Sequence, residues 1–393
     1  MNELDYIFSP VCIRDGAKKI FNETKLGNTH FHFHEEKVSS TVDFVMETIR
    51  ENYPDLNIPF HSRWGHFRPG NVDRALWLKE KIKHLDPMEQ ARIKWDLVIP
   101  SVLLDAGAGP QWKYHEKETS KEYARSEGLG VASFHLFMSG AFSNDKKSLR
   151  SDAMGLQSVN PKLIEEYFQV TQSNPLVGVE GRTSLLKNLG RALENKTIFK
   201  DGRPGNLIDY LVSKYGKTIP ATGLLRGVLD GLGPIWPGRE SLNGINLGDA
   251  WKHSKFGLIA FHKLSQWMSY SLVEPLLEAG ITVTGVEELT GLPEYRNGGL
   301  LLDTGVLTFK NPKDLEASWG PESDLIIEWR ALTVYLLDVI GAEVQKRLGK
   351  NPKDFPLAKV LEGGTWWAGR KIAALHRAGG TPPLNIISDG TVF

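Results

Sequence analysis

The sequence predicts a mainly α-helical fold, a single large helical unit with small β elements. Seven stretches place apolar residues at the helical spacing i, i+3, i+4, i+7. Strand candidates are few, and the strand–helix alternation of a doubly wound parallel sheet is missing, which argues against a Rossmann-type fold. The 393 residues suffice for one large domain or two merged ones. No low-complexity linker marks a division, so we predict one domain over residues 1–393, with residues 1–150 as a candidate N-terminal subregion.

The predicted elements follow in chain order. Helices are expected at 38–52, 72–85, 161–172, 182–195, 207–216, 261–280 and 324–349. Several begin after Asp, Asn, Ser or Pro and end in Gly, which are the usual start and stop signals. Strands are expected within 29–36, 97–104, 281–285 and 301–309. Residues 195–207 and 231–249 are predicted to be loops.

The composition argues against several classes of protein. The 47 basic and 47 acidic residues balance to a formal charge of zero, whereas a nucleic-acid interface needs a clustered basic excess. No apolar run reaches the roughly 18 residues of a membrane span, and residues 1–19 carry charges where a signal peptide needs its apolar stretch. The single cysteine, Cys12, fits a reducing compartment. We therefore expect a cytoplasmic protein with no nucleic-acid or membrane partner.

Three histidines alternate in the strand candidate 29–36. In a strand His30, His32 and His34 share one face, and two such side chains can bind a metal ion. The alternative is an amphipathic strand with its phenylalanines buried and its histidines outside. We favour the amphipathic strand, because no matching ligand cluster stands elsewhere in the sequence, and we expect no metal and no cofactor.

Two cationic or acidic positions in the first third of the chain have open alternatives. Arg63 lies in a turn rich in histidine and tryptophan, where its guanidinium either binds a phosphate or ties a loop to a helix C-terminus. Asp105 leaves the end of an apolar run, where it either faces a cavity or caps the N-terminus of a helix.

The last third of the chain holds the other candidates. Lys263 and Gln266 are three residues apart and therefore share a helix face. Glu294 and Arg296 lie in the glycine-rich "GLPEYRNGG", predicted to be a tight bend, where they either clamp helices or present a carboxylate to a ligand. Glu362 precedes two glycines and two tryptophans that could wall a planar ligand. Paired carboxylates in a dry pocket are the groups that cleave glycosidic bonds through an oxocarbenium-like transition state.

Long motifs of this sequence resemble those of a uracil-catabolism protein family formerly of unknown function. They are "NYPDLNIPFHSRWGHF", "SVLLDAGAG", "RSEGLG", "NPLVGVEGR", "FHKLSQWMSYSLVEPL", "LTGLPEYRNGG", "EWRALTVYLLD", "VLEGGTWWAGRK" and the terminal "SDGTVF". The family occurs with a uracil phosphoribosyltransferase and a cyclohydrolase-like enzyme thought to open the pyrimidine ring of the nucleotide. The resemblance therefore implies a substrate left after ring opening, which is ribosylurea or its 5'-phosphate.

The order of motifs is also similar to that of the queuosine salvage nucleosidases, which are all-helical and related to helix-hairpin-helix DNA glycosylases. The segments that carry this likeness are Phe261-His262-Lys263, Pro293-Glu294-Tyr295-Arg296, Leu361-Glu362 with Trp367 to Arg370, and Asp105 with Gln111-Trp112. The likeness implies a helix-hairpin-helix glycosylase-like core. Glutamate replaces the family's aspartate at 294 and at 362, which makes a small leaving group such as urea plausible.

The two resemblances together imply an N-glycosidase that hydrolyses ribosylurea, or its 5'-phosphate, to urea and the sugar. Glu294 would be the catalytic carboxylate and Arg296 would orient it. The implied substrate-binding residues are Lys263 and Arg63 at the phosphate, Glu362 and Asp105 at the urea or ribose hydroxyls, Trp367 and Trp112 as walls, and Tyr295, Arg370 and His262. Two alternatives are a non-catalytic sensor or scaffold that binds a pathway nucleotide, and a nucleosidase that acts on an intact pyrimidine nucleotide.

Overall fold

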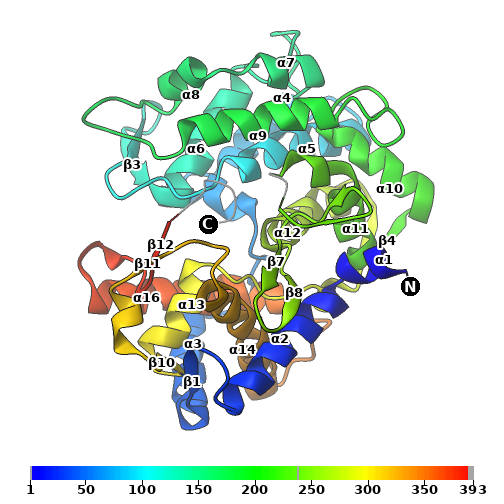
Figure 1. The fold of residues 1–393 in the computed structure, drawn as a ribbon. Coiled ribbons are helices and arrows are strands. Elements are labelled where there is room, and N and C mark those ends of the chain that lie inside the picture. Colours follow the sequence, from blue (N-terminus) through cyan, green and yellow to red (C-terminus); the bar gives the residue numbers. More distant parts are fainter. Residues whose placement is uncertain (1, 237–238, 388–393) are drawn as a thin grey trace. The chain divides into compact units, whose positions relative to one another are not determined.

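The computed structural model describes residues 2–236 and 239–387, and helices dominate them (Figure 1). This described part contains sixteen α-helices, with short strands of two to four residues between some of them. The strands form two-stranded pairs. The prediction of a mainly α fold is therefore confirmed, whereas the helix-hairpin-helix character of the core stays a prediction. In the same residues no helix combines the length and the apolar character needed to cross a membrane.

The chain divides into two compact units, and the division does not follow the order of the sequence. Within the described residues, unit 1 contains 2–61, 239–266 and 285–387, and unit 2 contains 62–236 and 267–284. Helix α12 (Lys263–Glu278) begins in unit 1 and continues into unit 2.

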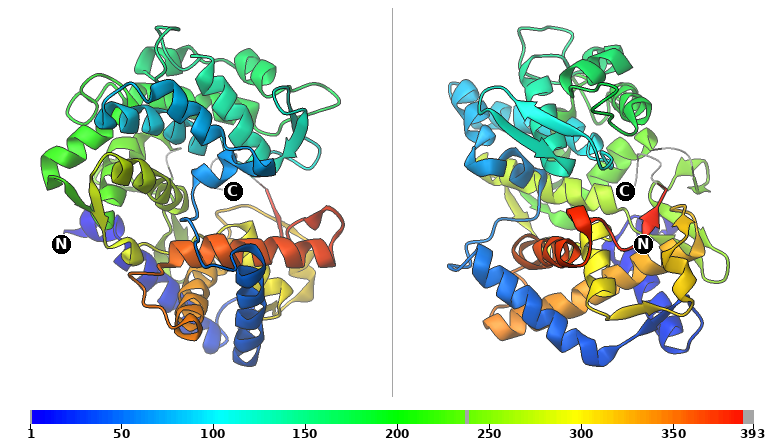
Figure 2. Two further views of the ribbon diagram at one scale, coloured as in Figure 1. Left: turned by 180° about the vertical axis from the view of Figure 1, so that it is seen from behind. Right: turned by 90° about the vertical axis from the view of Figure 1, so that its left-hand side faces the viewer.

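Unit 1 is built around the long helix α14 (Asp324–Leu348). Helices α2, α3 and α13 pack against it, so that segments from both ends of the chain lie side by side (Figures 1 and 2). Sixteen of its residues are buried, which is why its sequence is apolar on more than one face. The α-helices of unit 1 are α1 (Glu3–Ile7), α2 (Pro10–Lys25), α3 (Val38–Asn52), α13 (Tyr295–Asp303), α14, α15 (Leu357–Val360) and α16 (Trp366–His376).

Short strands and single helical turns complete unit 1. Its strand pairs are β1 (Phe31–Phe33) with β10 (Leu307–Phe309), β5 (Ser241–Leu242) with β6 (Ile245–Asn246), β7 (Ala250–His253) with β8 (Gly257–Ala260), all antiparallel, and β11 (Ser318–Trp319) with β12 (Asn385–Ile386), which is parallel. A π-helical turn, Leu361–Thr365, joins α15 to α16. Its 3₁₀ turns are Glu35–Lys37, Val286–Glu288, Pro312–Leu315 and Ala378–Gly380.

Unit 2 is built around α5 (Pro87–Leu103), which is buried almost throughout its last three turns. Asp86 caps its N-terminus by accepting the N–H groups of Met88 and Glu89, both at 3.0 Å. The other α-helices of unit 2 are α4 (Arg74–Ile82), α6 (Arg125–Met138), α7 (Ala153–Ser158), α8 (Pro161–Tyr167), α9 (Val179–Ala192), α10 (Leu207–Tyr215) and α11 (Ala221–Leu232). Its strand pairs are β2 (Lys113–Glu116) with β3 (Lys121–Ala124), antiparallel, and β4 (Thr218–Pro220) with β9 (Thr282–Thr284), parallel. Its 3₁₀ turns are Arg63–Phe67, Pro69–Asn71, Pro204–Asn206 and Gly233–Ile235.

Some predicted elements are wrong. The strand predicted at 97–104 is the last part of α5, because a helix buried on all sides presents an unbroken apolar run that resembles a buried strand. The strand predicted within 301–309 begins only at Leu307, since its first residues belong to α13. The loop predicted at 231–249 contains the β5–β6 hairpin, and its residues 237 and 238 lie outside the described residues. The sequence prediction had no counterpart for α1, α2, α5, α6, α7, α11, α13, α15 and α16.

Candidate functional site

Glu294 is the N-cap of α13 in unit 1. Its Oε2 accepts the N–H of Arg296 at 2.7 Å and its Oε1 accepts the N–H of Asn297 at 2.6 Å. Glutamate is not among the usual N-cap residues, which have shorter side chains. The two N–H groups and the helix N-terminus stabilise the negative charge of the carboxylate and hold it in one position, while the side chain stays partly exposed.

The glycines of "GLPEYRNGG" serve packing rather than a bend. Gly298 and Gly299 lie inside α13, and a Cβ on Gly298 would come within 2.4 Å of the Trp329 ring. A Cβ on Gly291 would likewise meet Leu337 at 2.7 Å. The prediction of a bend is wrong from Tyr295 onward, where the segment is helical, and the chain turns only before the helix, where the Glu294 N–H donates to the Leu292 carbonyl oxygen at 3.0 Å. The glycines allow the start of α13 to lie directly on α14.

Arg296 and Tyr295 form the first turn of α13, and both are partly exposed. The guanidinium of Arg296 donates to the carbonyl oxygen of Gly380 at 2.9 Å. Its backbone N–H is the group that donates to Glu294. Arg296 thus orients the carboxylate through its main chain.

Helix α16 brings Glu362 to the same region of unit 1. A Cβ on Gly369 would lie 2.1 Å from the carbonyl oxygen of Arg296, so α16 and α13 touch through their backbones. Glu362 lies in the π-helical turn that precedes α16, and π-helical turns are frequent at functional sites. Its Oε2 lies 2.7 Å from His61 Nδ1 and its Oε1 accepts the Tyr53 hydroxyl at 3.3 Å. Burial and the Glu362 charge raise the pKa of Tyr53, which therefore stays a donor.

Trp366, Trp367 and Arg370 follow on the first turn of α16. The two indole rings meet edge to face at 4.9 Å, and the Arg370 guanidinium lies 5.2 Å from the Trp367 ring and 5.8 Å from the Trp366 ring. All three side chains are partly exposed. They form a half-buried cationic and aromatic surface directly after Glu362.

Lys263 begins α12, and its backbone N–H donates to Asp249 at 3.0 Å. The same Asp249 carboxylate binds the buried guanidinium of Arg330 on α14. Burial disfavours this carboxylate, but the charge and hydrogen bonds of Arg330, with those of Trp251 and Lys263, outweigh burial and hold the pKa of Asp249 well below its usual range. Arg330 follows Trp329, the residue that packs on α13. Consecutive residues of α14 therefore support the starts of α12 and α13.

His262 precedes Lys263 and is buried, with 1% of its surface exposed. Its Nε2 donates to the carbonyl oxygen of Ile7 at 2.9 Å. Its φ of 48° lies in the left-handed region, which is strained for a residue other than glycine. Burial lowers the pKa of His262, so the ring is neutral.

Three predicted site residues belong to unit 2. Arg63 is fully buried, and it donates to Asp105 at 2.5 Å and to the Ser101 hydroxyl at 2.7 Å. Burial lowers the pKa of Arg63, an effect that Asp105 opposes. Asp105 follows the C-terminus of α5 and also accepts the Ser126 hydroxyl at 3.1 Å. Arg63 thus ties the end of α5 to its surroundings, which is one of its two predicted roles, and the N-cap alternative for Asp105 is wrong.

Trp112, the third residue in unit 2, is 1% exposed. Its indole N–H donates to the carbonyl oxygen of Phe168 at 2.8 Å. The site residues predicted from sequence are therefore distributed over both units. Those that share unit 1 are His262, Lys263, Glu294, Tyr295, Arg296, Glu362, Trp367 and Arg370.

The sequence motifs assigned no role in this site to four residues that contact it, which are Asp249, His61, Tyr53 and Gln266. Asp249 lies in a segment predicted to be a loop, and its partner Arg330 is far away in the chain. His61 stood in the same turn as Arg63 but belongs with Glu362. The sequence did contain one indication of these partners. Glu328 and Arg330 stand inside the apolar helix predicted at 324–349, and a charged residue buried in such a helix needs a partner.

Glu328 is the second charged residue inside α14. Its Oε2 accepts both the backbone N–H of His30 at 2.7 Å and the His30 ring at 2.8 Å. His253 lies 3.2 Å from Oε1. Phe31 is fully buried and His32 is exposed. The burial of Phe31 and the exposure of His32 agree with the predicted amphipathic strand, and His30 is a partner of the buried Glu328 carboxylate.

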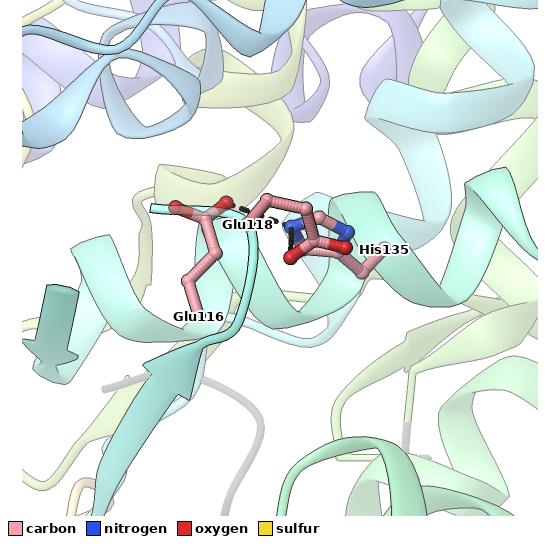
Figure 3. Close-up of side chains that lie close together, drawn as sticks. All are labelled: Glu116, Glu118 and His135. Carbon is pink, nitrogen blue, oxygen red and sulfur yellow. Dashed lines mark hydrogen bonds and ion pairs between the residues drawn. The ribbon is translucent and has the colours of Figure 1, made fainter. Parts of the chain in front are cut away.

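One group of side chains in unit 2 has the composition of a metal site (Figure 3). Glu116, Glu118 and His135 place their ligand atoms within 4.8 Å of one another. Glu116, however, already receives Arg74 on both oxygens, at 2.6 and 2.5 Å. Burial disfavours ionisation of Glu116, but hydrogen bonds from Arg74, His135 and Thr119 outweigh it and lower its pKa to about 2. Because the Arg74 guanidinium already binds both carboxylate oxygens of Glu116, these oxygens do not need a metal ion as counter-charge.

Comparisons with known proteins cover almost the whole chain. A family model described as "Protein of unknown function (DUF1688)" matches residues 6–393. The chain is 39% identical over 438 residues to "Uracil catabolism protein 4" of Lachancea kluyveri, with 100% of this chain and 99% of that protein covered. It is also 39% identical over 396 residues to "Protein urg3" of Schizosaccharomyces pombe, with 97% and 96% covered. The match to the family model includes every residue of the candidate site.

Proposed function

This chain belongs to the DUF1688 family, and we propose that it is a cytoplasmic N-glycosidase of uracil catabolism. In this proposal it hydrolyses ribosylurea, or its 5'-phosphate, to urea and ribose or ribose 5-phosphate. The name of the Lachancea kluyveri relative supports the pathway. The motif likeness to nucleoside-cleaving enzymes supports the reaction class.

The observation that carries the proposal is the geometry of Glu294. Two backbone N–H groups hold its carboxylate at the N-terminus of α13, and the side chain stays partly exposed. Each carboxylate oxygen keeps a second lone pair, because an ionised carboxylate has about four acceptor positions. A fixed anion of this kind can stabilise the positive charge that develops on the sugar ring as the glycosidic bond lengthens.

The proposed reaction breaks the bond between the anomeric carbon and the urea nitrogen. The electron pair of that bond leaves with the nitrogen, which takes up a proton and departs as neutral urea. A water molecule adds to the anomeric carbon and gives up a proton, for which Glu294 is the proposed acceptor. Water supplies both groups that the products gain, so the reaction consumes no other reactant.

The other residues of unit 1 have proposed binding roles. Lys263 would bind the 5'-phosphate, because the start of a long helix also favours an anion. Glu362, fixed by His61 and Tyr53, would accept hydrogen bonds from the urea or from ribose hydroxyls. Trp367, Arg370, Tyr295 and His262 would line the ligand. Arg63, Asp105 and Trp112 keep their ligand roles only as predictions, since each has structural partners within unit 2.

The deciding experiment is the release of urea from ribosylurea 5'-phosphate by the purified protein, compared with ribosylurea and with uridine monophosphate. The proposal expects stoichiometric urea and ribose 5-phosphate. If the protein releases uracil from uridine monophosphate but no urea from either ribosylurea compound, its substrate is the intact nucleotide. Tight binding of either compound without any turnover would show a sensor instead of an enzyme.

A further inference from the structure

Gln266 lies in the first turn of α12 and is completely buried. Its amide oxygen accepts the backbone N–H of Thr290 at 3.4 Å. This contact fixes the orientation of the amide, because the oxygen and not the nitrogen must face an N–H donor. The amide nitrogen then has two N–H groups and no hydrogen-bond partner among the described residues. Buried polar atoms of native proteins are nearly always paired, so this one needs an explanation.

His262, one turn earlier, has the complementary property. Because its Nε2 donates to Ile7, its Nδ1 carries a lone pair in the neutral ring. This Nδ1 is also buried without a partner in the described part of the chain. The strained backbone of His262 is a second unusual feature of the same position, and such strain clusters at ligand-binding sites.

Gln266 contacts the segment of unit 1 that leads to Glu294, and His262 adjoins Gln266, because the Gln266 N–H donates to the His262 carbonyl oxygen at 2.8 Å. Thr290, the partner of Gln266, precedes Glu294 by four residues, and the turn at Leu292 keeps this connection short. The start of α12 thus offers one donor and one acceptor, both uncharged. A neutral group with a carbonyl oxygen and an N–H matches this pair, whereas a phosphate offers no ordinary donor for His262.

We propose that Gln266 and His262 recognise the carbamoyl group, CO–NH₂, of the substrate. The amide nitrogen of Gln266 donates to the carbamoyl oxygen, and His262 Nδ1 accepts from the carbamoyl nitrogen. This inference rests on the proposed function, since ribosylurea carries such a group and the sugar phosphate does not. Gln266 becomes the residue that distinguishes ribosylurea from ribose, because a site built to pair an amide rejects a ligand that lacks one.

The test measures how two ligands, one with and one without the carbamoyl group, bind to variants of Gln266 and of a control residue, Gln345. Calorimetry measures the binding of ribosylurea 5'-phosphate and of ribose 5-phosphate in the Glu294→Gln background, which is expected to leave the ligand uncleaved. Adding Gln266→Met should weaken the binding of ribosylurea 5'-phosphate about tenfold, and leave the binding of ribose 5-phosphate unchanged. The control is Gln345→Met on α14, where the amide nitrogen donates to the carbonyl oxygen of Phe355 at 2.7 Å.

The thermal stability of the two variants provides a second reading. Gln266→Met removes a buried donor that has no partner and one long bond, the 3.4 Å contact with the Thr290 N–H, so Tm should fall less than with Gln345→Met. Gln345→Met removes a satisfied hydrogen bond, so Tm should fall while both ligands bind as before. A fall in Tm with Gln266→Met as large as with Gln345→Met, together with equal weakening of both ligands, would show a purely structural role and overturn the inference.

The outcomes separate this inference from the proposed function. If the protein releases urea but Gln266→Met binds both ligands normally, the inference fails and the function stands; the two atoms then pair with bound water. If no urea is released but Gln266 still determines selective binding of ribosylurea 5'-phosphate, the function fails and the inference stands. If the protein binds neither compound, both fail.

Discussion

Asp249 binds Arg330 with both carboxylate oxygens, at 2.8 and 2.7 Å, and the same carboxylate accepts the first N–H of α12. Arg330 is completely buried, and its guanidinium lies 4.0 Å from the Phe261 ring. The position of the α12 N-terminus, with Lys263, therefore depends on one ion pair with α14.

Replacing Asp249 by Asn should destabilise the protein by about 3–5 kcal/mol, because it leaves Arg330 as a buried charge without its counter-charge. The stabilisation by Asp249 should be fully present above the ordinary aspartate pKa, and should be lost as pH falls through its depressed folded-state pKa. The free energy of unfolding, measured by chemical denaturation at neutral and at acidic pH, tests both effects. Glu343→Gln, in an exposed pair with Arg347, is the control and should change little. Equal stability of Asp249→Asn and the parent at neutral pH would refute the role of this pair.

Glu294→Gln should lower urea release by at least ~100-fold, because the neutral amide cannot stabilise the oxocarbenium charge. It should also cost roughly 1 kcal/mol of stability, since its NH₂ group faces one of the two N–H groups that Glu294 caps. The control is Asp86→Asn at the cap of α5, where one oxygen, Oδ1, accepts both N–H groups. It should keep its activity and lose little stability, since asparagine caps a helix about as well as aspartate. Normal turnover of Glu294→Gln in a steady-state assay would eliminate Glu294 as the catalytic carboxylate.

Gly369→Ala should separate α16 from α13. The added methyl group would lie 2.1 Å from the Arg296 carbonyl oxygen, a main-chain atom that cannot rotate away. We expect a loss of about 1–3 kcal/mol from overpacking, and a fall in kcat/KM because Glu362 moves relative to Glu294. Gly233→Ala is the control and should change little, since a Cβ there would meet nothing within 4 Å and the φ of −50° is one that alanine adopts readily. An active Gly369→Ala enzyme with normal KM would show that the α13–α16 contact does not position the site.

His30 should make the stability depend on pH around neutrality. Its hydrogen bond to Glu328 raises the pKa of His30 above its ordinary value, despite partial burial. The sign follows: this stabilisation should be complete below about pH 6.5 and disappear as pH rises through the raised folded-state pKa. The difference in Tm between the parent and His30→Gln should therefore shrink from pH 6 towards about pH 9. His32→Gln, on the exposed side of β1, controls for the loss of a histidine. A difference that stays constant over this range would contradict the assignment.

The helical period of apolar residues predicted some helices and missed others: α14 was predicted although it is buried on more than one face, and α2 was missed although its buried residues follow that period. Val38–Asn52 was predicted with its observed bounds, because its apolar residues follow the helical period. In α5 burial on all sides erases that period, so the β-branched run 97–104 resembled a strand. The start of α13 was missed for another reason: its glycines lie where α13 touches α14, and no local pattern reveals such a contact.

The sequence named candidate site residues only where they stand in motifs. Glu294, Lys263 and Glu362 came from resemblance. The partners that hold them did not, since Asp249 pairs with Arg330 at a separation of 81 residues and His61 with Glu362 at a separation of 301. One sequence without its structure contains no record of such pairings. The pairing of His30 with Glu328 has the same character, with a separation of 298 residues.

The interleaved order of the two units constrains how the chain can fold as it leaves the ribosome. Residues 62–236 are synthesised without interruption and can begin to collapse early. The first segment cannot complete its packing early, because its partners lie near the other end of the chain. Helix α2 packs against α14, β1 pairs with β10, and Arg14 binds Asp338, which is 324 residues later. The apolar faces of α2 and α3 therefore stay without their partners until translation is nearly finished, which makes the nascent N-terminal segment a natural client for a chaperone.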